Sequence, residues 1–137
     1  MPSPSREILK IGLAVTRDGK LLLLRKRGGT SYILPGGKPE KGEDALQALL
    51  REIEEELGCG LNLGSLTYLG SFSDAAADTT EATVTVRLYS AELVGKPGPR
   101  SEIEAMTWLA PADMKAVTLA PSLVNSIVPF LSATGRL

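Results

Sequence analysis

A glycine and several charged residues recur at fixed spacings in the segment GKPEKGEDALQALLREIEEELGC, residues 37–59. The charged positions are Glu43, Arg51-Glu52 and Glu55-Glu56, between Gly37 and Gly58. Hard divalent cations such as Mg²⁺ take oxygen ligands and keep sites for water and substrate phosphates. The segment therefore predicts metal-assisted chemistry on phosphates. The alternative interpretation is a solvated acidic helix face, which is what most charge runs form.

A predicted helix carries these acidic residues. No Pro or Gly lies between Glu43 and Gly58, and apolar residues recur there at three- and four-residue steps, the period of an amphipathic helix. Positions i, i+3 and i+4 are neighbours on a helix, so Glu52, Glu55 and Glu56 are expected to crowd one face. A cation would compensate for their repulsion. We expect the turn Leu34-Pro35-Gly36-Gly37 to lead into the helix and Gly58 to cap its end.

The chain contains no histidine. This absence excludes Ser-His-Asp and Cys-His triads, histidine-ligated zinc and histidine general bases. Carboxylates, lysines and metal-bound water remain for acid–base work at neutral pH. Attack on phosphorus by a metal-activated water uses the glutamates already identified, because the cation lowers the pKa of the water and neutralises phosphate charge.

The spacing of the segment resembles the signature of the Nudix hydrolases at every fixed position: Gly, five residues, Glu, seven residues, Arg-Glu, apolar, any, Glu-Glu, any, Gly, apolar. Cys59 fills the last apolar position, where an aliphatic residue is more usual, and a buried Cys behaves as a small hydrophobe. The resemblance implies an α/β fold, an α/β/α sandwich with a mixed β-sheet between helices.

The resemblance also implies roles for individual residues and a Mg²⁺ cofactor that Mn²⁺ can replace. The implied metal ligands are the side chains of Glu52, Glu55 and Glu56, one of which can act as base, and the backbone carbonyl of Gly37. Glu43 is expected to support the site from the start of the helix. Arg51 is expected to pair with one of the carboxylates and hold it in place.

Candidates outside the signature are fewer. The basic run Arg25-Lys26-Arg27 lies where related enzymes place a cation on a substrate phosphate, although such residues face solvent by default. Glu102 lies where relatives carry an additional glutamate that binds metal or acts as the general base. Glu104 is the other candidate for that role. The alternative for both is a charged strand end.

Length and composition agree with a single domain over residues 1–137. The net charge of −1 argues against binding to a nucleic acid polymer, and the longest apolar run, Leu21 to Leu24, is too short for a membrane span. The N-terminal residues lack the apolar core of a signal peptide, so we expect a cytoplasmic protein. Its expected partner is a small nucleotide substrate. The sequence leaves the oligomeric state open, a homodimer included.

Several further elements are predicted from local pattern. Strands are expected over residues 7–16, 20–25, 65–73, 80–93 and 102–109, with a hairpin turn at Asp18-Gly19. Loops are expected over the basic segment 25–29, over 74–78 and over 95–100. A final helix is expected over 121–132, kinked or ended by Pro129.

The resemblance implies hydrolysis of a nucleoside diphosphate linked to another group. The leading hypothesis is a (d)NTP or oxidised (d)NTP giving a nucleoside monophosphate and pyrophosphate. Alternatives are an ADP-ribose, nucleotide-sugar or dinucleoside polyphosphate pyrophosphatase, and a nucleotide sensor without catalysis. The proline and tyrosine that mark two of these subfamilies are absent, since Asp74 to Asp78 occupies their places. The purine-reading asparagine of sanitation enzymes has no secure counterpart, because Ala120-Pro121 falls near its place and Asn125 lies several residues later.

Overall fold

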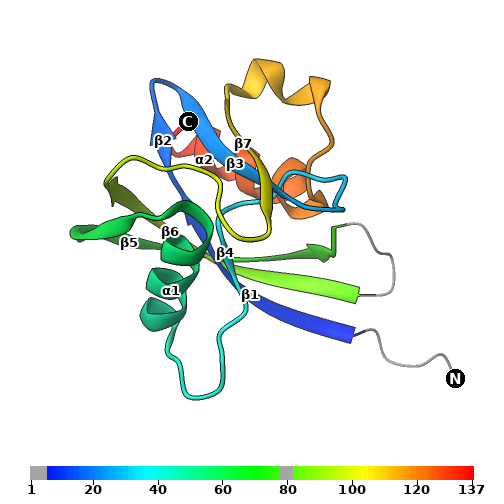
Figure 1. Cartoon of the computed structure of the whole chain (residues 1–137). Coiled ribbons are helices and arrows are strands. Elements are labelled where there is room, and N and C mark those ends of the chain that lie inside the picture. The colour runs from blue at the N-terminus through cyan, green and yellow to red at the C-terminus, as the bar shows by residue number, and fades with distance from the viewer. Residues whose placement is uncertain (1–5, 78–81) are drawn as a thin grey trace, which may run out of the picture.

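The computed structural model describes residues 6–77 and 82–137, whose strands form two sheets (Figure 1). The first sheet has the order β4 (Gly36–Gly37), β1 (Arg6–Ala14), β6 (Ala82–Val94) and β5 (Gly60–Ala75). The second has the order β2 (Thr16–Arg17), β3 (Lys20–Lys26) and β7 (Ile103–Leu109). β1 runs parallel to β6, whereas the other pairs are antiparallel. The predicted mixed sheet is confirmed.

Helices cover the strands on opposite sides (Figure 1). Helix α1 (Ala45–Leu57) buries its apolar stripe in one core cluster, and the π-helical segment Leu123–Ile127 with α2 (Val128–Ala133) packs in the other. The four leucines of β3 alternate between these clusters because successive side chains of a strand point to opposite faces. This arrangement confirms the predicted α/β/α sandwich.

Helix α1 begins with a capping box. Asp44 accepts a hydrogen bond from the backbone of Gln47 at 2.8 Å, and the Gln47 side chain accepts one from the backbone of Asp44 at 2.9 Å. Gly58 ends the helix in the left-handed conformation at φ 69°, as predicted, and its N–H donates to Glu54 O at 3.0 Å. Both ends of the helix that carries the signature are therefore fixed by local bonds.

Gly58→Ala is expected to lower the free energy of unfolding by about 1 kcal/mol, since an L-residue is disfavoured at this φ. The added Cβ also lies 2.7 Å from Arg100 Nη1, the end of a flexible side chain that can move aside. Urea unfolding measures the loss. The matched control is Gly98→Ala, which meets no heavy atom within 4 Å and should be nearly neutral. Equal stabilities of the two variants would contradict the capping role of Gly58.

The segment Leu34-Pro35-Gly36-Gly37, which was expected to be a tight turn, contains strand β4 instead. Gly36 and Gly37 pair with Gly12 and Ile11 of β1. A Cβ on Gly36 would lie 2.0 Å from the carbonyl oxygen of Ile11, so the backbones approach more closely than any side chain allows. This pairing fixes the start of the signature against the central strand.

The remaining elements differ from the prediction mainly at their ends. Asp18 and Gly19 have φ of 52° and 72°, which confirms the hairpin turn. Arg25 and Lys26 end β3 and do not begin a loop, and β5 extends from Gly60 to Ala75. The predicted loop end Asp78 and strand start Thr80 lie outside the described residues.

The carboxyl-terminal helical region continues past Pro129 to Ala133 and does not end at the proline. Its irregularity lies in the preceding turn, where the π-helical segment replaces regular α-helix. None of the helices in the described ranges is long and apolar enough to cross a membrane.

Candidate functional site

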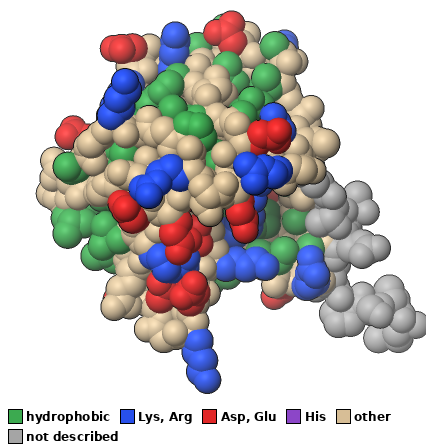
Figure 2. All heavy atoms as spheres, in the orientation of Figure 1, with side chains coloured by type: hydrophobic (Ala, Val, Ile, Leu, Met, Phe, Trp, Pro, Cys, Tyr) green, Lys and Arg blue, Asp and Glu red, His purple; other side chains and the backbone are tan. Residues whose placement is uncertain are grey.

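A cavity of about 500 Å³ lies between β1, β4, α1 and the carboxyl-terminal helical region. Gly37, Arg51 and Glu52 line one part of it. The lining elsewhere is mainly apolar and includes Ile8, Val84, Val86, Ala76, Ala120 and Leu123. Acidic and basic side chains intermingle on the face drawn in Figure 2. The cavity thus joins a charged wall from the signature to an apolar wall, and its volume suits a small organic ligand.

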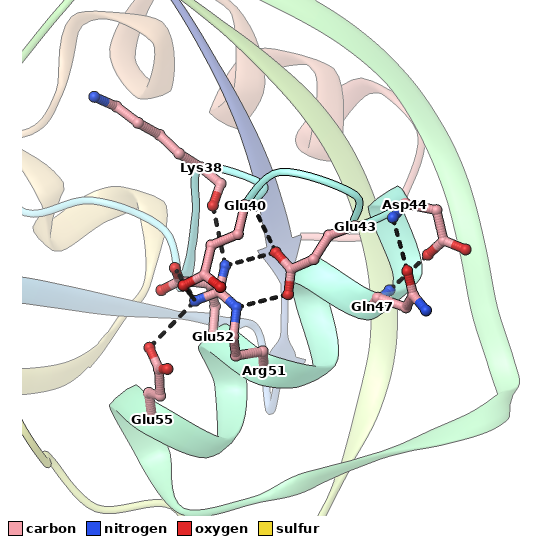
Figure 3. Close-up of polar contacts among 8 residues, drawn as sticks. All are labelled: Lys38, Glu40, Glu43, Asp44, Gln47, Arg51, Glu52 and Glu55. Carbon is pink, nitrogen blue, oxygen red and sulfur yellow. Dashed lines mark hydrogen bonds and ion pairs between the residues drawn. The ribbon is translucent and has the colours of Figure 1, made fainter.

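Arg51 is the centre of a network of carboxylates (Figure 3). Its Nε and Nη2 donate to the two oxygens of Glu43 at 2.7 and 2.9 Å, and Nη2 also donates to the carbonyl of Lys38 at 3.1 Å. Nη1 donates to Glu52 at 2.9 Å and to Glu55 at 3.3 Å. The bond from Arg51 holds the pKa of Glu43 down at about 2. Arg51 therefore fastens the loop before α1 to the helix and orients Glu52.

Glu56 is buried, with 5% of its surface exposed, and accepts a hydrogen bond from the Gly36 N–H at 2.8 Å. Burial raises its pKa to about 8, and the negative charge of Glu52 adds to the rise. The backbone bond and the positive charges of Lys26 and Lys10 oppose the rise. Without a cation, this carboxyl is mainly protonated at neutral pH.

The raised pKa of Glu56 predicts that the metal-free protein loses stability as the pH rises from 4.5 to about 8. The unfolded carboxyl ionises near 4.5, whereas the folded protein keeps it protonated until about 8. The unfolded state then binds fewer protons across this range, so the free energy of unfolding falls with pH and levels off above it. Urea unfolding in EDTA measures this slope. Glu56→Gln is expected to flatten it, and an unchanged slope would contradict the assignment.

Glu52 lies directly against Gly37. A Cβ on Gly37 would come within 2.5 Å of Glu52 Cδ, so the carboxylate occupies space that only glycine leaves open. Burial raises the pKa of Glu52, whereas the hydrogen bond from Arg51 lowers it. Glu56, which is buried, and Glu52, which is half-buried, are thus two neighbouring carboxyls of α1 with raised pKa values, and carboxylate oxygens are the kind of donor that a hard divalent cation takes.

The side chains of Glu52, Glu55 and Glu56 do not all point to one site. Glu55 is exposed and turns toward Arg51 (Figure 3). Within residues 6–77 and 82–137, no three acidic or cysteine side chains stand close enough to hold a metal together. The guanidinium of Arg51 lies among the carboxylates that helix periodicity placed on one face.

The predicted basic residues separate in the structure. Lys26 lines the cavity, whereas Arg25 and Arg27 do not. Arg25 pairs with Glu104 at 2.9 Å across β3 and β7, and Arg27 is exposed. Glu102 is exposed and does not line the cavity. Its backbone carbonyl accepts a hydrogen bond from the backbone N–H of Arg27. Lys26 is thus the member of the run that is positioned to meet a ligand in the cavity.

Several charged cavity residues were not predicted from the sequence, among them Lys10 on β1 and Lys38 after β4. The available signal for Lys10 was a lysine inside the apolar strand ILKIGLAV. Ala120 lines the cavity, and Asn125 donates to Asp74 at 2.7 Å outside the lining. Asn125 is therefore held by another side chain and does not line the cavity.

The sequence of this chain is similar to those of known proteins. The family model described as the NUDIX domain matches residues 8–131. The chain is 34% identical over 89 residues to "Putative 8-oxo-dGTP diphosphatase 2" of Mycobacterium tuberculosis, covering 65% of this chain and 60% of that protein. It is 26% identical over 128 residues to "CTP pyrophosphohydrolase" of Escherichia coli, covering 89% of this chain and 90% of that protein.

A solved structure shares the fold. The crystal structure of a MutT NUDIX hydrolase from Burkholderia pseudomallei matches with a TM-score of 0.72 and 27% identity, covering 87% of this chain and 95% of that chain. The family match spans most of the sequence, and the signature residues Gly37, Arg51 and Glu52 line one cavity. The chain therefore belongs to the NUDIX domain family and is a Nudix hydrolase.

Proposed function

We propose that this enzyme hydrolyses a nucleoside triphosphate, canonical or oxidised, to a nucleoside monophosphate and pyrophosphate with Mg²⁺ or Mn²⁺ as cofactor. The observation that carries the proposal is that Glu52 and Gly37 line the same cavity as a set of apolar side chains. A nucleotide has the matching halves, a polyphosphate and a flat, largely apolar base. The names of two relatives, an 8-oxo-dGTP diphosphatase and a CTP pyrophosphohydrolase, support this substrate class.

The cofactor would be held by Glu52, by Glu56 and by the carbonyl of Gly37, with Glu55 reaching the site if it leaves Arg51. When bound, a divalent cation lowers the pKa of a water and neutralises charge on phosphate oxygens. Ionised Glu56 is the favoured form beside such a cation, because the opposite charge counteracts the rise in its pKa.

The chain's own residues supply orientation and charge. Arg51 holds Glu52 and Glu43 at 2.7 to 2.9 Å, so the Glu52 carboxylate keeps its position against Gly37. Lys26 faces the cavity and supplies a positive charge to a polyphosphate. The apolar side chains of β1 and β6 exclude water from the face of the base. The chemistry is then a hydrolysis for which positioning and charge neutralisation provide most of the rate.

The test is a substrate panel with the purified protein. Canonical and oxidised (d)NTPs, ADP-ribose, nucleotide sugars and dinucleoside polyphosphates are incubated with Mg²⁺, with Mn²⁺ and with EDTA. Products are separated chromatographically, and pyrophosphate is distinguished from phosphate by a coupled pyrophosphatase. We expect metal-dependent release of pyrophosphate and a monophosphate from a triphosphate. Cleavage restricted to diphosphate-linked compounds, or turnover unaffected by EDTA, would contradict the proposal.

A further inference from the structure

Lys10 lies on the strand that forms the floor of the cavity. Ile8, Lys10 and Gly12 alternate along β1 and all line the cavity, as do their neighbours Val84 and Val86 on β6. The β1–β6 register pairs Ile8 with Val84 and Lys10 with Val86. Arg6, at the start of the same strand, also lines the cavity. Lys10 therefore presents a long cationic side chain between Ile8 and Gly12, four residues closer than Arg6 to the end of β1 that pairs with β4.

Among residues 6–77 and 82–137, Lys10 has no direct polar partner. It is only partly exposed, and burial lowers its pKa, as do the charges of Lys26 and Lys38, whereas Glu56 and Glu52 raise it. No hydrogen bond or ion pair joins its ammonium to another described residue. The ammonium carries three donors, and a half-buried charge without a partner is costly. An anionic ligand atom in the cavity would relieve that cost.

The register of the sheet places Lys10 between the two parts of the cavity. Ile11 pairs with Gly37, so the metal side begins one residue beyond Lys10, and the apolar row Ile8–Val84 lies two residues before it. At about 3.3 Å per residue, Lys10 stands roughly 7 Å from the apolar row. A nucleotide that lies along β1, with its base on Ile8 and its terminal phosphates near Glu52, passes its first phosphate over Lys10.

We propose that Lys10 binds the substrate phosphate nearest the nucleoside and so sets the register of the nucleotide between the apolar wall and the signature carboxylates. The inference rests on the proposed function, because it assigns a contact within the same substrate site. It also separates Lys10 from Lys26, which reaches the cavity from β3 of the other sheet. Lys10, from the four-stranded sheet, and Lys26, from the three-stranded sheet, then bind different parts of one polyphosphate.

The test compares ligands that differ by one phosphate, in EDTA, so that neither metal nor turnover contributes. NMR titrations give the dissociation constants of 2′-deoxycytidine, dCMP, 2′-deoxyguanosine and dGMP for the wild type, Lys10→Met, Lys10→Arg and Lys20→Met. Methionine keeps the length of the side chain and removes its charge. Lys20 is an exposed lysine at the β2–β3 hairpin outside the cavity lining and provides the matched control.

We expect at least one monophosphate to bind the wild type about tenfold more tightly than its nucleoside, as a charge-assisted hydrogen bond provides. Lys10→Met should reduce that ratio to below about threefold without changing nucleoside affinity, while Lys10→Arg and Lys20→Met largely keep it. A wild-type ratio in Lys10→Met, or no monophosphate advantage in the wild type, would overturn the inference. Triphosphate turnover by the wild type is measured separately, so failure of the Lys10 contact is distinguishable from failure of the proposed function.

Discussion

Glu56→Gln is expected to lower kcat by at least about 10²- to 10³-fold, the scale of losing one major electrostatic contact at a reacting centre. Glutamine keeps the volume of the side chain and an oxygen that can accept the Gly36 N–H, now 2.8 Å from Glu56. It cannot supply the negative charge that would bind a cation. The loss should therefore appear in turnover and in metal affinity. Steady-state kinetics at saturating Mg²⁺ measure the first, and metal titration measures the second.

The fold of Glu56→Gln should survive, because the buried carboxyl with its pKa of about 8 is mainly neutral in the metal-free protein at pH 7. The free energy of unfolding in EDTA is expected to change by no more than about 1 kcal/mol. Glu54→Gln is the matched control on the same helix, since Glu54 is exposed and pairs with Arg100 at 3.4 Å. Mg²⁺-dependent turnover by Glu56→Gln within tenfold of the wild type would show that Glu56 holds no essential cation.

Gly37→Ala is the second substitution with a large expected effect, a loss of about 100-fold in kcat/KM. The new Cβ would lie 2.6 and 2.8 Å from the two oxygens of Glu52, so the carboxylate must move. A displacement of about 1 Å at a catalytic group can cost a factor of this size. The φ of Gly37 lies outside the left-handed region, so alanine meets no backbone strain there.

A matched glycine separates this effect from a general loss of stability. Gly60→Ala, in β5, brings its Cβ no closer than 3.9 Å to Val94, an ordinary contact, and should keep wild-type activity. Circular dichroism and urea unfolding verify that both variants fold. Wild-type kcat/KM in folded Gly37→Ala would contradict the idea that Glu52 needs its present position against the glycine.

Elements with a local sequence period were predictable. The helix with its three- and four-residue steps and the alternating strand β6 were both correct, because side-chain direction follows the backbone period within each element. The capping box was harder to place, since Glu43 and Asp44 are adjacent acids and both can accept bonds at a helix start. Asp44 is the cap, and Glu43 turns to Arg51.

Features that depend on distant pairing were not predictable from the sequence. Gly36 and Gly37 show no alternation, and they form a strand because β1 lies beside them. Arg25 does not line the cavity, because its side chain pairs with Glu104, which lies 79 residues later in the chain. Lys10 lines the cavity because it pairs with Val86 of the parallel strand β6 on the face of the sheet that forms the cavity. The roles of the signature glutamates in metal binding remain predictions.

The proposed hydrolysis depends on a divalent cation held by Glu52 and Glu56. The most direct test is Mn²⁺ binding followed by electron paramagnetic resonance, with triphosphate turnover measured in the same samples of wild type, Glu52→Gln, Glu56→Gln and Glu54→Gln. We predict that the wild type and Glu54→Gln bind Mn²⁺ and cleave the nucleotide, and that the other two variants lose both properties together. Undiminished Mn²⁺ binding by Glu52→Gln and Glu56→Gln, or wild-type hydrolysis in EDTA, would contradict this role of the two glutamates.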